Sequence, residues 1–549
     1  MFNSGGGTSS YIDMEETDYI LLWGSNARET HPVMFLHMLK GIENGARMVA
    51  VDPRRTLSVE AAHDWLPIRV GADIALANAM GHVIIEEGLQ HTWFVEHATT
   101  GFEDYKRAVE RYTPEYAEGI TGIPAAKIRE VARDFARART GMICWTLGIT
   151  EHHNATDNVL ALINLGLLTG KVGRDGCGLN PLRGQNNVQG GGDMGALPDR
   201  LPGFQHVEND ELRGKFERVW GASIPPKRGW NQSGMMDAME RGELRALFVL
   251  GENPLASDAN AGHVEQLLRG LDFLVAQDIL MQQTAELADV VLPGAASWAE
   301  TEGTVTSSER RVQLCRKALD PPGEARNDWE VLQDLANRMG AHWNYTSAEQ
   351  IWDELRSLSP IHAGMSYKRL EEHRGLQWPC YDETHPGERA MHWRLWRDPL
   401  IGAQVPFMPT EYEPPVEQAD ATYPFTLTTG RRLEFYNTGV QSGLYDSARP
   451  QEEFIEMNPD DAAERGISEG ALVRVTSRRG SLTLRTHLNP GLYRGLAFMS
   501  LHFPDQTMTN VLTIHATDPK SGTAEFKASA INIELAHASD MTPHQSDAR

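Results

Sequence analysis

Short apolar runs alternate with amphipathic stretches over the first 300 residues of the chain. Residues 19–24 (YILLWG) are continuously apolar up to a glycine, which is typical of a parallel strand buried on both faces. A helix is predicted from about Pro32, and the stretch around Ile128 has apolar residues on one helical face and charged residues opposite. Further strands are predicted at residues 47–52, 141–146, 246–250, 273–278 and 290–292. This alternation predicts an α/β fold with doubly wound parallel-sheet domains.

The pattern changes in the last third of the chain. Residues 330–400 are predicted to be mostly helical, with Ser347 and Gln350 forming a capping box. Prolines and acidic residues then dominate a stretch with the composition of a linker. Beyond it the apolar period becomes two, and the alternating runs on either side of Gly480 predict a β-hairpin. The expected organisation is an α/β region of two intertwined subdomains, a proline-rich linker, a β-rich, β-barrel-like domain and a polar tail, at residues 1–401, 402–424, 425–536 and 537–549.

Charge and hydropathy narrow the range of partners. The chain has 51 Lys+Arg against 75 Asp+Glu, a net charge of −24, which disfavours nucleic acid as a partner. The longest apolar run, at residues 159–168, is too short for a membrane span, which needs about 20 residues. The N-terminus has no basic region, apolar core or twin-arginine pair that would direct export. We therefore expect a soluble, cytoplasmic protein with no direct membrane insertion.

The four cysteines, Cys144, Cys177, Cys315 and Cys380, lie far apart and form no CxxC motif. Their spacing therefore predicts neither a zinc site nor an iron–sulfur cluster. We interpret them as four separate buried thiols in a reducing compartment, and we predict no metal-ligating residue in this chain.

The loops that follow four of the predicted strands share small, polar and proline residues. They lie at residues 24–32, 52–56, 251–254 and 277–278. Parallel sheets bind ligands beyond the carboxyl ends of their strands, where small residues and helix N-termini admit phosphate groups. No GxGxxG follows any strand, so ordinary NAD binding is disfavoured. Each loop alone is better explained as a capped turn. Together, at matching strand ends, they predict one or two nucleotide-like ligands.

Residues 180–195 form the segment with the densest polar composition. They include five glycines, five side-chain amides and one arginine, with almost nothing that could fill a core. Such a composition is typical of a loop that lines a polar cavity. The planar guanidinium of Arg183 suits a carboxylate or a phosphate. The alternative is that Arg183 only fastens a glycine-rich loop.

The run NPLRGQNNVQG at residues 180–190, followed by DMGALP at 193–198, resembles the signature of formate dehydrogenase catalytic (alpha) subunits, which belong to the molybdopterin oxidoreductase superfamily. The resemblance covers nearly the whole chain, including GSNARETHP at 24–32, VDPR at 51–54, GENP at 251–254, AQD at 276–278, ADVVLP at 288–293, QWPC at 377–380, TGR at 429–431, YNT at 436–438, DP at 518–519 and EFK at 525–527. It implies a molybdenum or tungsten ion held by two pyranopterin guanine dinucleotides, the bis(molybdopterin guanine dinucleotide) cofactor. The α/β domains would bind one or both of its guanine ends, and the β-rich domain would close over it.

The same resemblance implies roles for individual residues. Arg183 would orient the formate carboxylate, and Gln185 would contact a pterin. The residues that would line the dinucleotide pockets are Asn26, Asp52, Asn253, Ser257, Gln277, Asp278 and Asp328. The residues that would reach the cofactor from the C-terminal cap are Arg431, Asn510, Phe526 and Lys527.

The chain departs from the family pattern in two places. The family usually has Ala-Cys before the DMG motif, where this chain has Gly191 and Gly192. Family members also begin with a four-cysteine domain that holds a [4Fe–4S] cluster, a relay lysine, a selenocysteine or cysteine that ligates the metal, and a histidine that accepts a proton. Residues 4–10 resemble the stretch just after that metal ligand. Our hypothesis is that an in-frame UGA codon for selenocysteine is read as a stop, so that Met1 marks a restart.

The sequence therefore predicts the catalytic-subunit fragment of a molybdenum or tungsten formate dehydrogenase, which oxidises formate to CO₂. Electrons would pass to an iron–sulfur chain and an electron-transfer partner subunit, and the fragment alone would be inactive. One alternative keeps the enzyme class but takes nitrate or another oxo compound, although the Arg183 segment argues against it. A second alternative is a truncated, non-catalytic protein that binds the cofactor or docks to a full-length partner.

Overall fold

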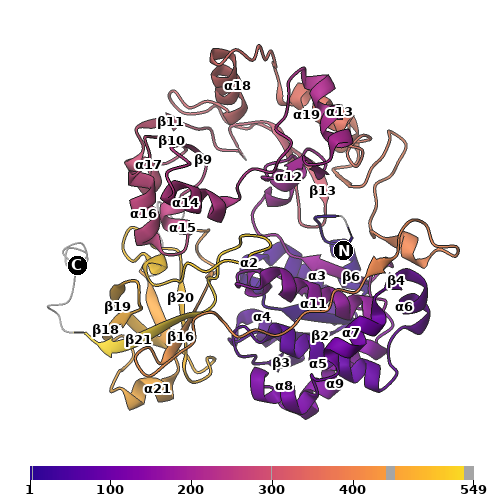
Figure 1. The fold of residues 1–549 in the computed structure, drawn as a ribbon, viewed down its shortest axis with the longest axis vertical. Helices are drawn as coiled ribbons and strands as arrows, with labels where there is room; N and C mark the ends of the chain where they lie inside the picture. The colour runs from indigo at the N-terminus through magenta and orange to yellow at the C-terminus, as the bar shows by residue number, and fades with distance from the viewer. Residues whose placement is uncertain (3, 298, 440–451, 537–549) are drawn as a thin grey trace.

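The computed structural model describes residues 1–2, 4–297, 299–439 and 452–536 (Figure 1). An α/β domain built from the first part of the chain lies beside a C-terminal β-barrel, and two smaller units lie above them. The predicted polar tail at 537–549 lies outside the described residues. Among the described residues, no helix combines the length and the apolar character needed to cross a membrane.

The first sheet is parallel throughout, as the apolar runs predicted. Its strand order is β3-β2-β1-β5-β6. The strands are β1 (Tyr19–Trp23), β2 (Arg47–Val51), β3 (Asp64–Leu66), β5 (Met142–Trp145) and β6 (Gly178–Pro181). The chain runs outward from β1 in one direction and then returns to add β5 on the other side. This reversal makes the carboxyl ends of β1 and β5 a topological switch point, where open α/β sheets bind ligands.

Strand β1 is apolar along its whole length because it faces two cores. Leu21 and Trp23 pack into the large core on one face of the sheet, while Ile20 and Leu22 pack into a second core on the other. Burying each such side chain stabilises the fold by roughly 1.5–3 kcal/mol. The first core is covered by α5 (Asp73–Glu86), α9 (Ala125–Arg137) and α11 (Ala155–Leu168), and the second by α1 (Tyr11–Glu16) and α3 (Pro32–Glu43). Shorter elements complete this domain: α2 (Ala27–Thr30), α4 (Leu57–Ala61), α6 (Thr92–Ala98), β4 (Thr99–Thr100), α7 (Phe102–Val109), α8 (Pro114–Thr121) and α10 (Leu147–Thr150).

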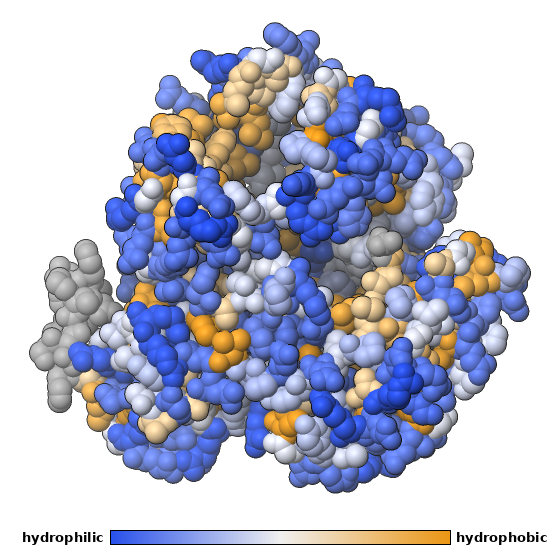
Figure 2. Space-filling view, viewed as in Figure 1, coloured by the Kyte–Doolittle hydropathy of each residue, from blue (hydrophilic) through white to orange (hydrophobic). Residues whose placement is uncertain are grey.

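A second, smaller parallel sheet has the order β11-β10-β9. Its strands, β9 (Ala246–Leu250), β10 (Phe273–Asp278) and β11 (Val290–Pro293), confirm three further predicted strands. The helices beside it are α14 (Gln232–Glu240), α15 (Pro254–Ser257), α16 (Ala261–Arg269) and α17 (Gln283–Leu287). Figure 2 shows a mostly hydrophilic face, on which apolar side chains gather over this unit and α18 (Asp328–Arg338) at the upper left.

Residues 330–400 are less helical than predicted. Besides α18 they contain α19 (Ala348–Leu358), α20 (Tyr367–Glu372) and a 3-10 turn, η1 (Trp393–Trp396), joined by long irregular segments. The capping box is only half formed. Ser347 accepts the Gln350 backbone N–H at 3.3 Å, but the Gln350 side chain accepts the N–H of Thr346 rather than that of Ser347. The neighbouring elements are α12 (Val188–Asp193), β7 (Arg200–Leu201), β8 (Gln205–His206), α13 (Asp210–Trp220), β12 (Gly303–Thr306), β13 (Arg311–Cys315) and β14 (Leu376–Gln377).

The proline-rich segment at 402–424 connects the α/β domain to the barrel, but it is not a free linker. Its strand β15 (Val405–Pro406) pairs in parallel with β4. Val405 and Phe407 enter the large core, and the Thr410 carbonyl accepts a hydrogen bond from Asn78 Nδ2 at 2.9 Å. The segment therefore runs along the α/β domain as an ordered strap (Figure 1).

The C-terminal strands close into a barrel in the order β16-β20-β17-β19-β18-β21. The predicted hairpin is confirmed: Val473 lies opposite Leu484 and Val475 opposite Leu482, and alternate residues point into the barrel core. The elements of this domain are β16 (Phe425–Gly430), β17 (Phe454–Met457), α21 (Pro459–Glu464), β18 (Leu472–Thr476), β19 (Ser481–Leu488), β20 (Leu496–Ser500), η3 (Thr509–Val511) and β21 (Ser529–Leu535).

The expectation of four buried thiols was wrong for one of them. Cys144, Cys177 and Cys380 are buried, but Cys315 is only half-buried because it ends β13 in a small antiparallel sheet. Burial also raises the pKa of Cys144 to about 12, which suppresses its reactive thiolate.

Titration of the native protein with Ellman's reagent should therefore modify Cys315 first. We expect about one thiol to react rapidly under native conditions, because a thiol must be both accessible and ionised to react. All four should react after denaturation. Rapid native reaction of two or more thiols would contradict this assignment of burial.

Candidate functional site

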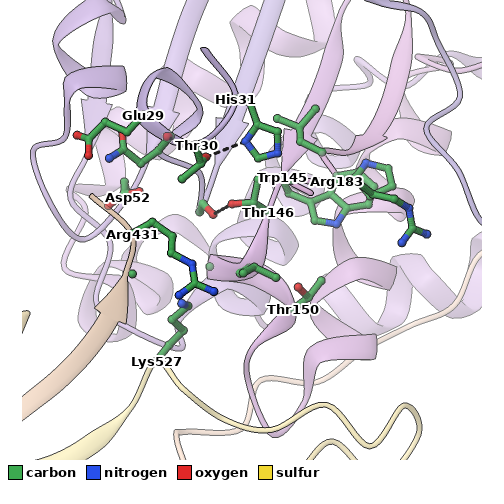
Figure 3. Close-up of a pocket in the computed structure, with 18 of the residues that line it drawn as sticks. Glu29, Thr30, His31, Asp52, Trp145, Thr146, Thr150, Arg183, Arg431 and Lys527 are labelled. Atoms are coloured by element: carbon green, nitrogen blue, oxygen red, sulfur yellow. Dashed lines mark hydrogen bonds between the residues drawn. The ribbon is translucent and has the colours of Figure 1, made fainter. Parts of the chain in front are cut away.

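A cavity of about 800 Å³ opens at the switch point of the first sheet. The loops after β1, β2 and β5 form one side, the glycine-rich segment after β6 forms a second, and the barrel closes the third (Figure 3). Its lining includes Asn26, Asp52, Arg183, Gln185, Arg431 and Lys527. Six of the residues singled out in the sequence therefore meet in one place, although they come from five separate parts of the chain.

The strand-end loops contact each other through glycine backbones. Gly148 donates its N–H to the Gly24 carbonyl at 3.1 Å, and a Cβ added at Gly148 would lie 2.6 Å from Gly24 Cα. Gly24 itself has a φ of +56°, which favours glycine. The side chain of Thr146 donates to the same Gly24 carbonyl at 2.7 Å. Because neither Gly24 nor Gly148 has a side chain, a ligand can approach the backbone at this part of the cavity wall.

His31 lines the cavity, and sequence reasoning gave it no role. Its Nδ1 lies 2.7 Å from Oγ1 of Thr30, while its Nε2 is buried without a hydrogen-bond partner. Burial lowers the pKa of His31, so the imidazole is neutral near pH 7. The only sequence feature that points to His31 is its position in the polar loop at residues 24–32, which follows the first strand.

The surroundings of Asp52, which follows the second strand, change its pKa strongly. Burial raises the pKa of Asp52 to about 6, against the opposing charge of Arg54. Its Oδ1 accepts the backbone N–H of Arg54 at 2.9 Å. Asn26, at the end of the first strand, accepts a hydrogen bond from Ser58 Oγ at 3.0 Å. Both side chains are therefore held at the cavity by neighbours from their own domain.

Cations stand at two ends of the cavity, with half-buried Arg183 at one end and half-buried Arg431 and buried Lys527 at the other (Figure 3). Burial lowers the pKa of both arginines, which is the sign of a charge held away from water. Neither arginine has a carboxylate within 4 Å among the residues that the structure describes. An anionic ligand would compensate both charges.

Arg183 is fixed by one contact and leaves most of its donors free. Its Nη2 donates to the Gly5 carbonyl at 2.7 Å, and its Nε is buried without a partner. Gln185, two residues on, donates to Asn437 Oδ1 of the barrel at 3.0 Å. The glycine-rich segment therefore contacts both the N-terminal residues and the barrel, as a cavity-lining loop should.

Polar contacts join the barrel domain to the α/β domain beside the cavity. They pair residues 151–157 with residues 518–527, and we term them the interdomain seam. Fully buried Glu525 accepts hydrogen bonds from Nδ1 of His152 and Nδ1 of His153, each at 3.1 Å. Although burial favours its neutral form, these two bonds lower the pKa of Glu525 to about 2. Lys527 Nζ, 2.6 Å from Glu151 Oε2, extends the seam to the cavity.

Seven of the sequence-predicted residues lie outside this cavity. Most of them surround the carboxyl end of the second sheet, where Gln277 Nε2 donates to Asp328 Oδ1 at 2.7 Å. Asn510 Nδ2 donates to the Ala256 carbonyl at 2.9 Å. The backbone carbonyl of Phe526 accepts a hydrogen bond from the Thr429 hydroxyl at 2.9 Å. The seven are Asn253, Ser257, Gln277, Asp278, Asp328, Asn510 and Phe526.

This second group also contains a residue that sequence reasoning missed. Burial raises the pKa of Asp258 to about 7, and its Oδ2 is buried without a partner. Oε1 of Gln277 is likewise buried and unpaired. The signal for Asp258 was weak, since it only follows Ser257 in the sequence. Unpaired buried polar atoms at this sheet end mark a second place where a polar ligand would complete the bonding.

Comparison with known families decides the class of protein. Residues 2–338 match the family model described as molybdopterin oxidoreductase, and residues 425–530 match the "Molydopterin dinucleotide binding domain". The chain belongs to the molybdopterin oxidoreductase family. The second match coincides with the barrel domain, so the part of the molecule that closes the cavity is the family's dinucleotide-binding module.

The relatives of this molybdopterin oxidoreductase include several formate dehydrogenases. The F420-dependent formate dehydrogenase subunit alpha of Methanocaldococcus jannaschii is 42% identical over 97% of this chain and 79% of its own length. Formate dehydrogenase H of Escherichia coli is 34% identical over 97% of this chain and 74% of its own length. The assimilatory nitrate reductase catalytic subunit of Bacillus subtilis is 36% identical, over 96% and 75%.

A solved structure supports the same fold. Acetylene hydratase from Pelobacter acetylenicus superposes with a TM-score of 0.72 over 96% of this chain and 79% of that chain. The two sequences are 21% identical, so the likeness concerns the fold alone. It confirms the expected architecture of α/β domains with a C-terminal barrel.

The family assigns this oxidoreductase a bis(molybdopterin guanine dinucleotide) cofactor with molybdenum or tungsten. The residues present fit such a group. Arg183 and Arg431, which have no carboxylate partner among the described residues, can bind the phosphates of a dinucleotide, and unpaired buried atoms such as Ser25 Oγ and Gln277 Oε1 offer further hydrogen bonds. Two separate clusters, at the carboxyl ends of two sheets, match the expectation of two dinucleotides.

Proposed function

We propose that this protein is the catalytic subunit of a formate dehydrogenase, which oxidises formate to CO₂ and releases two electrons and one proton. The observation that carries the proposal is that Arg183 lines the cavity with most of its hydrogen-bond donors unused. Its guanidinium donates a single hydrogen bond, from Nη2 to the Gly5 carbonyl. A planar guanidinium binds a carboxylate through parallel N–H···O bonds, and formate is the smallest carboxylate.

The chain's own residues would bind and orient the reactants. Arg183 holds the formate carboxylate, while Arg431 and Lys527, with Asn26, Asp52 and the other predicted pocket residues, hold the dinucleotides. The bound molybdenum or tungsten group would supply the redox chemistry by accepting the electron pair of the formate C–H bond. We further propose that the electrons leave through an iron–sulfur chain to a partner subunit, as in the formate dehydrogenases that the sequence resembles.

One alternative substrate is suggested by a specific relative. The Bacillus subtilis nitrate reductase is as similar to this chain as the Escherichia coli formate dehydrogenase is. Nitrate is also a planar monoanion, and a guanidinium can bind it. The Arg183 segment nevertheless resembles the formate dehydrogenase signature, so formate remains our proposal. A third possibility is a protein that holds the cofactor without turning over a substrate.

The three candidates differ in one experiment on protein purified from its own source with its cofactor. Metal and guanine nucleotide are first quantified per chain, and formate-dependent reduction of benzyl viologen is then compared with nitrate-dependent oxidation of reduced methyl viologen. We expect formate turnover from the natively purified protein, whereas we propose that the present sequence, expressed alone, is inactive. Nitrate turnover alone would replace the proposed substrate, and a full cofactor load with neither activity would indicate a non-catalytic cofactor-binding protein.

A further inference from the structure

Asp193 is connected to Arg183 by a short chain of hydrogen bonds. Asp193 ends α12 and is fully buried, and its Oδ1 accepts a bond from Gln189 Nε2 at 2.7 Å. The same Gln189 nitrogen donates to the Gly5 carbonyl at 3.1 Å. That carbonyl is the acceptor that fixes Arg183, at 2.7 Å. Gly5 therefore receives one donor from the arginine and one from the neighbour of the carboxylate.

The groups around Asp193 leave its charge poorly compensated. Its Oδ2 accepts the indole N–H of Trp378 at 2.7 Å, which is a neutral donor. His362 Nε2 is 4.0 Å from the same oxygen, but burial lowers the pKa of His362 to about 3, so it is neutral. The charge of Arg310 also acts on Asp193. Its N–H groups, however, donate to the backbone carbonyls of Gly7, Trp378, Glu388 and Arg389. Burial accordingly raises the pKa of Asp193 to about 7.

We propose that Asp193 is a positioning residue that sets how tightly Arg183 binds the substrate anion. An ionised Asp193 and an anion on Arg183 are like charges that share one cation inside the protein, where interactions are poorly screened. Protonation of Asp193 removes this competition, so Arg183 binds the anion more tightly. By reciprocity, binding of the anion favours uptake of a proton by Asp193. This inference rests on the proposed function, because it assigns the substrate to Arg183.

The variant Asp193→Asn tests the role of the charge while keeping the shape. An asparagine whose side-chain oxygen faces Gln189 keeps both bonds of Gln189 Nε2, to position 193 and to the Gly5 carbonyl, and loses only the acceptor of the Trp378 N–H. The holoenzyme is titrated calorimetrically with azide, a small monoanion that is not oxidised like formate, in two buffers of different ionisation enthalpy. We expect wild type to take up a fraction of a proton per azide at pH 7 and Asp193→Asn to take up none.

The Michaelis constant for formate provides the second measurement. In wild type it should rise between pH 6 and pH 8, by at most about tenfold per unit, as Asp193 ionises. In Asp193→Asn it should stay flat at the low-pH value of wild type. His362→Gln, which removes the nearest other titratable group, should keep the wild-type rise. A purely structural role for Asp193 would change stability or kcat without abolishing either the proton uptake or the pH dependence.

Each outcome bears on one proposal or the other. An Asp193→Asn enzyme whose KM rises with pH as in wild type would overturn the inference, and so would a wild type that binds azide without proton uptake. The wild-type calorimetry stands even if the variant does not fold. Proton-linked azide binding in a protein that does not oxidise formate would sink the proposed function and leave the coupling of Asp193 to Arg183 intact.

Discussion

Replacing Arg183 with lysine is expected to lower kcat/KM for formate by about 10²–10³-fold, the usual loss when one preorganised donor to a reacting anion is removed. Lysine keeps the positive charge but has a single nitrogen. It cannot contact the Gly5 carbonyl, as Arg183 does at 2.7 Å, and present a planar pair of donors to formate as well. The measurement is steady-state viologen reduction at varied formate concentration, with metal content per chain determined in parallel.

Arg311→Lys is a matched control for this substitution. Arg311 pairs with Glu309 at 2.8 Å and does not line the cavity, so its replacement should change kcat/KM by no more than about twofold. If the Arg183→Lys enzyme had full metal content and a near-normal kcat/KM, Arg183 would not bind the substrate. Loss of metal in Arg183→Lys would instead assign Arg183 to the cofactor.

Replacing Glu525 with alanine is expected to destabilise the protein by about 3 kcal/mol, because it breaks a buried charge network and leaves two partners behind. Glu525 is fully buried between His152 and His153, and it joins the barrel to the α/β domain. The same change should speed the loss of bound metal on dilution, since the interdomain seam holds the barrel over the cavity. Thermal unfolding and timed metal analysis after gel filtration measure the two effects.

The pH dependence of the interdomain seam follows from the directions of the shifts. The pKa of Glu525 is lowered from 4.5 to about 2, so its contribution to stability is present above pH 4.5 and is lost as the pH falls toward 2. The pKa of His153 is raised above 6.5 by its bond to Glu525, so its contribution is present below pH 6.5 and is lost as the pH rises through the raised value. The seam should be strongest between about pH 4.5 and 6.5.

Glu413→Gln is the control for the seam. Glu413 lies 3.8 Å from His153 Nε2 but is exposed, and an exposed pair of this kind contributes at most about 1 kcal/mol. A Glu525→Ala protein as stable as Glu413→Gln, with the same metal retention and the same pH dependence as wild type, would show that the seam does not hold the barrel in place.

Local patterns in the sequence predicted much of the fold because their causes are local. The five continuous apolar residues of β1 follow from a strand that faces a core on each side, and the alternation in β18 and β19 follows from a strand with one buried face. The same reasoning overestimated helix in residues 330–400. There the chain is held by side-chain contacts to distant segments, such as Arg310 to the carbonyls of Glu388 and Arg389, which no local period reveals.

The sequence by itself determined the class of fold, the family and the polar loops that make up the candidate site. These depend on residue type and on spacing of a few residues, which the chain carries directly. Only the tertiary structure decided which of those residues share a cavity, since Arg183 and Lys527 meet there from segments more than 300 positions apart. It also decided that hydrogen bonds through Gln189 and the Gly5 carbonyl connect Asp193 to Arg183, and that Glu525 joins two domains. Such relations depend on where the chain returns in space, and burial and charge at those contacts exist only once the fold has formed.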